Sequence, residues 1–168
     1  MIRPVCLDDA DSLACIYNYY VTNTFISFEE AEIDSESMRS RIQKALQAGH
    51  TWLVQEDESK NILGYAYCAP WKERSAYRFS YEMTIYLSHS AQGKGVGSQL
   101  YQALLAAIKS KPIKTLLAII ALPNDASVAL HEKIGMKKVA HFENVGYKFD
   151  RWVDVGYWQM NLAKTPTD

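Results

Sequence analysis

The 168-residue chain is long enough to fold as one domain with a substantial hydrophobic core. Its 48% hydrophobic and 22% charged residues are typical of a soluble globular protein, and its net charge of −1 creates no field that would favour nucleic acid or an anionic membrane. The sequence contains neither an apolar stretch of roughly 20 residues nor a signal-peptide layout at its N-terminus. We therefore expect a cytoplasmic protein without a nucleic-acid or membrane partner.

The cysteines and histidines give no sign of a metal site. The three cysteines are odd in number and lack metal-ligand spacing, and the four histidines are scattered along the chain. We expect no bound metal and no disulfide framework. The cysteines, Cys6, Cys15 and Cys68, are expected to be reduced and mostly buried.

The hydrophobic pattern predicts an α/β (α+β) domain with the element order β-α-α-β-β-β-α-β-α-β-β. Such a chain forms a mixed sheet with helices on both faces. In the first part we expect a strand over residues 2–6, a helix over 7–21, a polar and aromatic loop over 22–32, and a helix that Asp34 or Ser35 caps and Gly49 ends.

The second part is predicted to contain most of the strands. We expect strands over residues 51–55, 62–69 and 79–87, a glycine-rich turn over 92–97 that opens a helix, a strand covered on both faces over 115–122, a helix from Asn124 to before Gly135, and strands over 136–145 and 147–162. The domain should span residues 1–163, and a polar tail should follow over residues 164–168.

The glycine turn, residues 92–98, lies between a strand and a helix and is suited to binding an anion. Glycines let the backbone N–H groups approach a phosphate, the helix N-terminus adds partial positive charge, and Lys94 can neutralise the ligand. The same residues could instead make only a tight turn. The nucleotide-hydrolase pattern is absent, and the dinucleotide fingerprint is matched only in part.

Several motifs together resemble those of the GNAT N-acetyltransferases. They are Gln92-x-x-Gly95-x-Gly97 after a strand that ends at residues 85–87, and the segment Asn124-x-x-Ser127-x-x-Leu130-His131-Glu132-Lys133-x-Gly135-Met136. Residues 64–74 and 146–159 resemble the phosphinothricin and methionine sulfoximine acetyltransferase branch, and residues 16–20 and 28–30 agree with it. The likeness covers nearly the whole chain.

This resemblance implies a single-domain GNAT fold with a mostly antiparallel sheet, a splayed central strand pair and acetyl-CoA as cosubstrate. It implies that the glycine turn holds the coenzyme A pyrophosphate, while the strand before it and Asn124 contact the pantetheine arm. The implied cofactor-binding residues are Ile85, Tyr86, Leu87, Gln92, Gly93, Lys94, Gly95, Val96, Gly97, Ser98, Asn124 and Ser127. The branch also forms dimers, and the Trp- and Tyr-rich C-terminal strand could supply the dimer face.

Glu82 is the candidate general base. It lies in the middle of a strand, on the polar face with Ser80 and Thr84, and a carboxylate within a covered sheet is costly unless it is paired or used. Such a carboxylate could also be satisfied by a neighbouring residue. The resemblance matches Glu82 to the family's catalytic glutamate, which would act directly or through a water molecule.

His131 is the second catalytic candidate. Many members of the wider family carry a tyrosine here as the acid for the departing thiolate, whereas this chain, like the resembled branch, has histidine. His131 would serve as acid or as orienting group, although a lone histidine on a helix surface often has neither role.

Lys72 and Arg74 can bind a carboxylate and would repel a polycation, although most loop Lys and Arg residues are simply solvated. The resemblance implies that this loop and residues 82–84 border the acceptor, a small amine that resembles an amino acid. The candidate acceptor-binding residues are Phe28, Lys72, Glu73, Arg74, Glu82, Met83, Thr84 and Tyr147. The resemblance makes methionine sulfoximine, methionine sulfone and phosphinothricin the leading acceptors. The alternatives are another amine (a polyamine, an aminoglycoside or a protein N-terminus), a non-catalytic acyl-CoA-binding module, and an interaction domain without a ligand.

Overall fold

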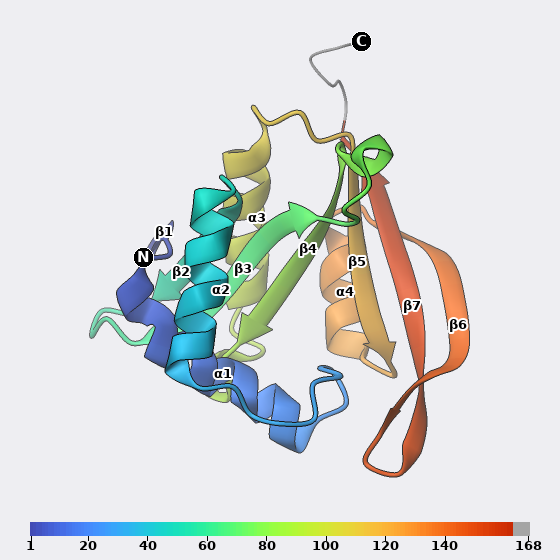
Figure 1. Ribbon diagram of the computed structural model, residues 1–168, viewed down its shortest axis with the longest axis horizontal. Helices are drawn as coiled ribbons and strands as arrows, with labels where there is room; N and C mark the ends of the chain where they lie inside the picture. Colours follow the sequence, from blue (N-terminus) through green and yellow to red (C-terminus); the bar gives the residue numbers. More distant parts are fainter. Residues whose placement is uncertain (163–168) are drawn as a thin grey trace.

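The computed structural model describes residues 1–162, which form one seven-stranded mixed sheet flanked by helices (Figure 1). The strand order is β1-β2-β3-β4-β5-β7-β6. The elements are β1 (Ile2–Pro4), α1 (Ala10–Asn23), α2 (Ser35–Gln47), β2 (Thr51–Glu56), β3 (Ile62–Pro70), β4 (Ser80–Leu87), α3 (Val96–Ile108), β5 (Thr115–Leu122), α4 (Asp125–Lys133), β6 (Lys137–Lys148) and β7 (Arg151–Asn161), with short 3-10 turns at Leu7–Asp9, Ser75–Tyr77 and His89–Ala91. The expected element order is confirmed. The domain end at residue 163 and the tail over 164–168 lie outside the described residues.

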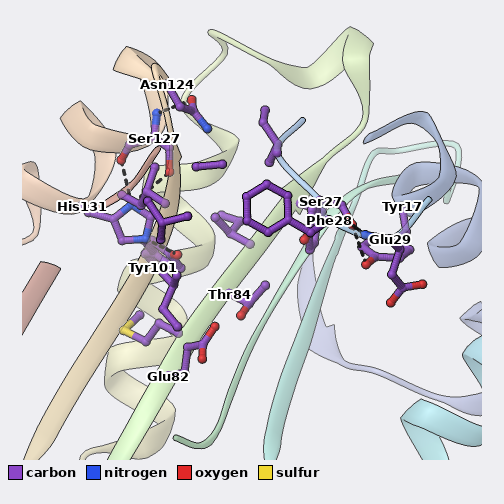
Figure 2. A pocket seen from close by; sticks show the side chains of 18 residues that line it. Tyr17, Ser27, Phe28, Glu29, Glu82, Thr84, Tyr101, Asn124, Ser127 and His131 are labelled. Carbon is purple, nitrogen blue, oxygen red and sulfur yellow. Dashed lines mark hydrogen bonds between the residues drawn. The ribbon is translucent and has the colours of Figure 1, made fainter. Parts of the chain in front are cut away.

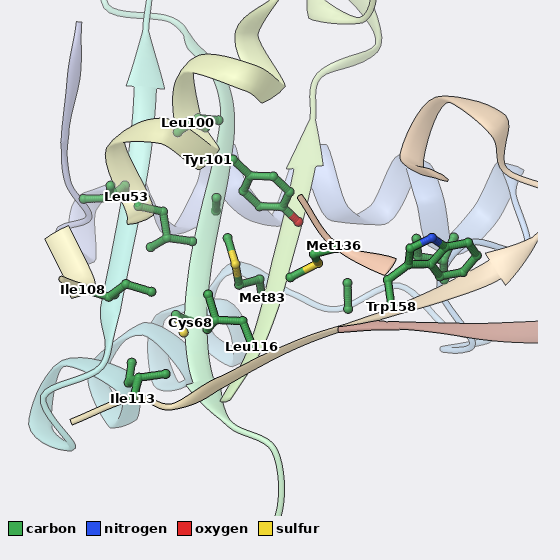
Figure 3. Packing of buried hydrophobic residues seen from close by; sticks show 14 of the residues in the cluster. Leu53, Cys68, Met83, Leu100, Tyr101, Ile108, Ile113, Leu116, Met136 and Trp158 are labelled. Carbon is green, nitrogen blue, oxygen red and sulfur yellow. The ribbon is translucent and has the colours of Figure 1, made fainter. Parts of the chain in front are cut away.

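The sheet separates two hydrophobic clusters, because successive strand residues face opposite sides. On one face, Trp52, Val54 and Tyr65 pack against α1 and α2. On the other face, Leu53 and Met83 pack with α3 and α4, and Figure 3 shows this cluster extending from Ile108 to Trp158. No helix among residues 1–162 is long and apolar enough to cross a membrane.

The centre of the sheet is a parallel pair that separates. β4 pairs with β5 only at Ser80↔Thr115, Tyr81↔Leu116 and Glu82↔Leu117, although both strands continue for several residues. β4 stays bound to β3 up to Leu87, and β5 stays bound to β7 up to Leu122. The two halves of the sheet therefore diverge beyond Glu82, and Figure 1 shows the gap.

The last hairpin differs from the prediction. A break at Gly146 was expected, but β6 continues through Gly146 to Lys148, and the chain turns at Phe149 and Asp150. Those two residues have φ angles of 51° and 54°, as a two-residue hairpin turn requires. Gly146 is needed inside the strand, because a Cβ at this position would overlap the ring of Phe28.

The expectation of mostly buried cysteines is wrong. Cys68 is buried on β3, whereas Cys6 and Cys15 are exposed, and all three thiols are free. Cys15 lies between buried positions of α1 but on the outer side of that helix, so helical periodicity leaves it in solvent.

The N-cap of α2 allows a test of whether the Asp34 side chain stabilises this helix. Asp34 has extended backbone geometry, and its carboxylate accepts a 2.7 Å hydrogen bond from the Ser37 N–H. We predict that Asp34→Ala lowers the free energy of unfolding by about 1 kcal/mol, because this N–H loses its partner. Urea unfolding measures the change. The neighbouring substitution Ser35→Ala, which leaves the cap in place, should cost clearly less, and an equal loss in both variants would contradict the capping role.

Candidate active site

A cleft of about 480 Å³ passes through the gap between β4 and β5. Its lining includes Glu82 and Thr84 from one face of β4 and Met83 and Ile85 from the other, which is only possible where the neighbouring strand has moved away. Figure 2 shows three groups around it: Tyr101 and His131 on one side, Glu82 and Thr84 along β4, and the loop between α1 and α2 opposite. The polar side chains of the lining are Tyr17, Ser27, Glu29, Glu82, Thr84, Tyr86, Tyr101, Asn124, Ser127 and His131.

Glu82 is an unpaired carboxylate in this cleft. It is partly buried at the point where the pairing of β4 with β5 ends, and no residue among 1–162 gives it a hydrogen bond or an ion pair. Burial raises the pKa of Glu82, and the positive charge of Lys72 opposes this shift. A carboxylate with a raised pKa and no protein partner is typical of a group kept for proton transfer.

His131 is buried, not on the helix surface, and both of its ring nitrogens have partners. Nδ1 lies 2.7 Å from the Ser127 carbonyl oxygen, which can only accept, so Nδ1 carries the hydrogen. Burial lowers the pKa of His131, although the Ser127 carbonyl acts the other way. In the neutral ring, Nε2 then accepts from the Tyr101 hydroxyl at 2.7 Å. The hydroxyl of Tyr101, itself fully buried, is thereby held at the wall of the cleft.

The loop between α1 and α2 closes the opposite side. Ser27 is buried, and its hydroxyl lies 2.8 Å from the Tyr17 hydroxyl. The Glu29 carboxylate forms a 2.9 Å ion pair with Arg41, which helps to lower the Glu29 pKa against the effect of burial. Phe28 lies between these two fixed residues and lines the cleft.

A second cleft, of about 340 Å³, adjoins the first at Ile85, Asn124 and Ser127 and continues along the glycine turn. Gly93 and Gly95 have φ angles of 72° and 81°, which favour glycine, and Gly95 caps the N-terminus of α3. Side chains are therefore absent where backbone N–H groups open toward the cleft.

The exposed edge of β4 supplies backbone groups to both clefts. Ser88 N–H bonds to Leu63 O and Trp71 N–H bonds to Ser80 O, so the even-numbered residues of β4 pair with β3. Ile85 and Leu87 consequently turn their N–H and C=O groups toward the gap. The Tyr20 hydroxyl, 2.6 Å from Leu87 O, occupies that carbonyl, whereas no strand lies opposite Ile85.

The comparisons with known proteins agree with this geometry. A family model described as an acetyltransferase (GNAT) domain matches residues 2–156. The chain belongs to the GNAT acetyltransferases. A phosphinothricin N-acetyltransferase of Streptomyces viridochromogenes is 37% identical to it over 161 residues, covering 96% of this chain and 87% of that protein. An L-methionine sulfoximine/L-methionine sulfone acetyltransferase of Pseudomonas aeruginosa is 31% identical, covering 98% of this chain and 95% of that protein.

A solved structure gives the same result. The crystal structure of a GNAT superfamily phosphinothricin acetyltransferase from Sinorhizobium meliloti, in complex with AcCoA, has a TM-score of 0.95 at 30% identity and covers 100% of this chain and 91% of that chain. The GNAT fold, the N-acetyltransferase activity and the resemblance to the phosphinothricin and methionine sulfoximine branch are thus confirmed.

GNAT acetyltransferases use acetyl-CoA, and the second cleft of this acetyltransferase fits such a molecule. A cleft with an open strand edge suits the pantetheine arm, and a glycine turn at a helix N-terminus suits a pyrophosphate. Of the cofactor residues expected from the sequence, those that line this cleft are Ile85, Leu87, Gln92, Gly93, Gly95, Gly97, Ser98, Asn124 and Ser127. Lys94 is exposed on the turn, Val96 is buried in the core, and Tyr86 lines the first cleft instead.

The expected acceptor residues lie in three places. Phe28, Glu82, Met83 and Thr84 line the first cleft. Lys72, Glu73 and Arg74 surround a separate hollow with Trp71 and Tyr77, beyond the end of β3, although the charge of Lys72 acts on Glu82. Tyr147 lies away from both, since it points outward from β6 and packs on Trp152 with 5.0 Å between ring centroids.

Several residues at these clefts were not identified as site residues from the sequence, and three of them make hydrogen bonds that shape the clefts. Tyr20 bonds to Leu87 and Gln92, Tyr101 bonds to His131, and Ser27 bonds to Tyr17. Tyr20 and Tyr101 occupy inward helix positions, where an aromatic residue normally indicates core packing. A hydroxyl at a buried position was the available signal, because a buried Tyr O–H usually has a partner.

The pKa of His131 makes stability depend on pH. Its folded pKa lies below the unfolded value of about 6.5, so its contribution is complete above that pH and is lost as pH falls through the folded pKa. We predict that the loss of unfolding free energy on acidification is smaller in His131→Asn than in the wild type. Urea unfolding between about pH 7.5 and about pH 5.5 tests this. His89→Asn, at an exposed histidine, is the control, and equal slopes in all three proteins would refute the prediction.

Proposed function

We propose that this acetyltransferase transfers the acetyl group of acetyl-CoA to the α-amine of a small amino-acid-like acceptor of the methionine sulfoximine, methionine sulfone or phosphinothricin type. The unpaired carboxylate of Glu82, in a first cleft that adjoins the second cleft along the glycine turn, carries this proposal. The names of the relatives from Streptomyces and Pseudomonas support the acceptor class.

Transfer to an amine requires removal of a proton from the ammonium. Acetyl-CoA, when bound, supplies the activated acetyl group. An oxygen of the Glu82 carboxylate accepts the proton of the acceptor ammonium, directly or through water, and the raised pKa makes this carboxylate a stronger base than an exposed glutamate. The free N–H of Ile85 is the backbone donor that the chain offers at the gap, where negative charge develops on the acetyl oxygen.

His131 has an orienting role in this proposal. With Nδ1 donating to Ser127 and Nε2 accepting from Tyr101, the neutral ring has no N–H directed into the cleft. It fixes the Tyr101 hydroxyl at the wall near Glu82, and burial is the main cause that raises the Tyr101 pKa. Tyr101 has one hydroxyl hydrogen, which it donates to His131 in this arrangement. To donate to the departing thiolate, the hydroxyl turns that hydrogen into the cleft, and the proton that the thiolate gains is replaced by the one that the nitrogen loses as the amide forms.

The acceptor's carboxylate needs a cation that the first cleft lacks. The described lining includes Glu29 and Glu82 but no Lys or Arg side chain, and Glu29 is already neutralised by Arg41. We assign this contact to Lys72 and Arg74 on the loop after β3, with Glu73 beside them, because the charge of Lys72 acts on Glu82. Phe28, Met83 and Thr84 would contact the rest of the acceptor. The side chain of Tyr147 lies away from this cleft, and its role in binding the acceptor stays a prediction from the sequence.

We predict that the wild type releases coenzyme A thiol with methionine sulfoximine, methionine sulfone and phosphinothricin and that Glu82→Gln lowers kcat/KM by about 10²–10⁴-fold, since the amide cannot take the proton. Glu58→Gln, at an exposed position, is the matched control.

Because the Glu82 pKa is raised, kcat/KM of the wild type should begin to fall at a higher pH than for an ordinary glutamate as the pH decreases. The Glu82→Gln variant should lack this acidic limb of the pH profile.

The other outcomes separate the alternatives. Turnover with spermidine or an aminoglycoside alone would keep the enzyme class but refute the acceptor. Binding of acetyl-CoA without turnover on any amine would favour a non-catalytic module.

The cytoplasmic location and the absence of a metal, a nucleic-acid partner or a membrane partner remain predictions from the sequence.

We also propose that the enzyme is a homodimer that uses the β6–β7 hairpin. Large apolar side chains are exposed along it, namely Val139, Phe142, Val145, Tyr147, Phe149 and Trp152. Such a patch is more extended than the scattered apolar residues of a typical monomer surface.

We predict that Trp152→Glu, at a side chain that is 61% exposed, converts the dimer to a monomer because it places a charge in the apolar patch. Light scattering coupled to size-exclusion chromatography measures the mass. Lys137→Glu, on the same hairpin but outside the patch, should remain dimeric. A monomeric wild type would refute the dimer.

A further inference from the structure

Lys148 is a buried lysine whose ammonium donates hydrogen bonds to two backbone carbonyls and lies 5.0 Å from the centroid of the Phe149 ring. The residue is 3% exposed, and its Nζ donates to Val21 O and to Ser27 O, both at 2.6 Å. No carboxylate within residues 1–162 forms an ion pair with it, and the charges of Glu30 and Glu29 act from further away. Burial lowers the Lys148 pKa against those charges. Burying a cation costs free energy. A lysine at this buried position therefore indicates that its charge is needed for the two carbonyl contacts.

The two carbonyls belong to different parts of the chain. Val21 lies in the last turn of α1, where carbonyl oxygens lack partners within the helix and a positive charge is favourable. Ser27 lies in the loop that closes the first cleft. One ammonium therefore ties the end of α1 and the closing loop to β6, 121 residues or more away in the sequence.

Neighbouring contacts fix the same loop against the same strand. Gly146 precedes Lys148 by two residues and faces the same side, and its missing Cβ leaves room for the Phe28 ring. The Arg151 guanidinium lies 4.4 Å from the centroid of the Phe25 ring. The inner side of the hairpin thus fits the loop from Phe25 to Phe28, and Figure 1 shows the two segments at the same end of the molecule.

We infer that Lys148 is a positioning residue for the acceptor: its ammonium holds the Ser27 carbonyl so that Phe28 stays at the wall of the first cleft. The inference rests on the proposed function, because it takes the first cleft as the acceptor site. Lys148 does not itself line that cleft, and it contacts neither Glu82 nor the glycine turn. Its loss should therefore weaken acceptor binding more than it slows the chemical step.

The test compares Lys148→Met with Lys137→Met, an exposed lysine of the same strand. We expect Lys148→Met to raise the KM for methionine sulfone by about tenfold or more, with kcat and the KM for acetyl-CoA changed by less than about threefold. Hydrogen exchange of the segment 22–30 should become faster in this variant and stay unchanged in Lys137→Met. A lower kcat at unchanged acceptor KM, or unchanged exchange, would overturn the inference.

A second variant covers the case in which Lys148→Met does not fold. Gly146→Ala leaves the ammonium in place but pushes the Phe28 ring away from β6, so it should raise the same KM without faster exchange at Val21. An unchanged acceptor KM in Gly146→Ala would refute the role of this contact. Failure of the proposed function is a separate result, since the wild type would then not turn over methionine sulfone at all, whereas the exchange measurement would still report on Lys148.

Discussion

The separation of β4 from β5 beyond Glu82 is the constraint on which the rest of the site depends. Had the parallel pairing continued to Leu87, the backbone of Ile85 would bond to β5, and the first cleft would be closed. Each strand stays in the sheet because its outer neighbour, β3 or β7, keeps its full register. The fold can therefore leave a row of backbone groups open at its centre without losing the core, which most sheets avoid because unpaired edges are costly.

The gap also brings together side chains that a closed sheet would keep apart. Glu82 and Thr84 face the side of α1 and α2, whereas Tyr101 and His131 belong to helices on the opposite side. Alternation along a strand normally separates such groups by the thickness of the sheet. With the strands apart, the carboxylate, the held tyrosine hydroxyl and the open backbone edge border one cavity, as Figure 2 shows.

The sequence predicted the features that depend on local pattern. The alternation of β4 placed Glu82 and Thr84 on one face, the glycine turn was found between strand and helix, and Asp34 was one of two N-cap candidates. Features that depend on distant contacts were missed. Gly146 looked like a turn residue because nothing nearby in the sequence shows the Phe28 ring against it, and the burial of His131 depends on Tyr101, thirty residues earlier. The direction of the loop that carries Lys72 and Arg74 could not be derived for the same reason.

The polar groups that have hydrogen-bond or ion-pair partners, and those that lack them, indicate where in the clefts the reaction takes place. Around the clefts, Tyr101 and Ser127 satisfy His131, Ser27 satisfies Tyr17, Arg41 satisfies Glu29, and Tyr20 satisfies the Leu87 carbonyl. Each of these pairs is fixed and gives up little freedom when a ligand arrives. The Glu82 carboxylate and the Ile85 backbone are among the cleft groups to which the described protein gives no such partner. A buried polar group without a partner costs free energy. A ligand that bonds to the Glu82 carboxylate and to the Ile85 backbone recovers that cost. The strongest new interactions of the ligand therefore form in the part of the cleft that lies between these two groups.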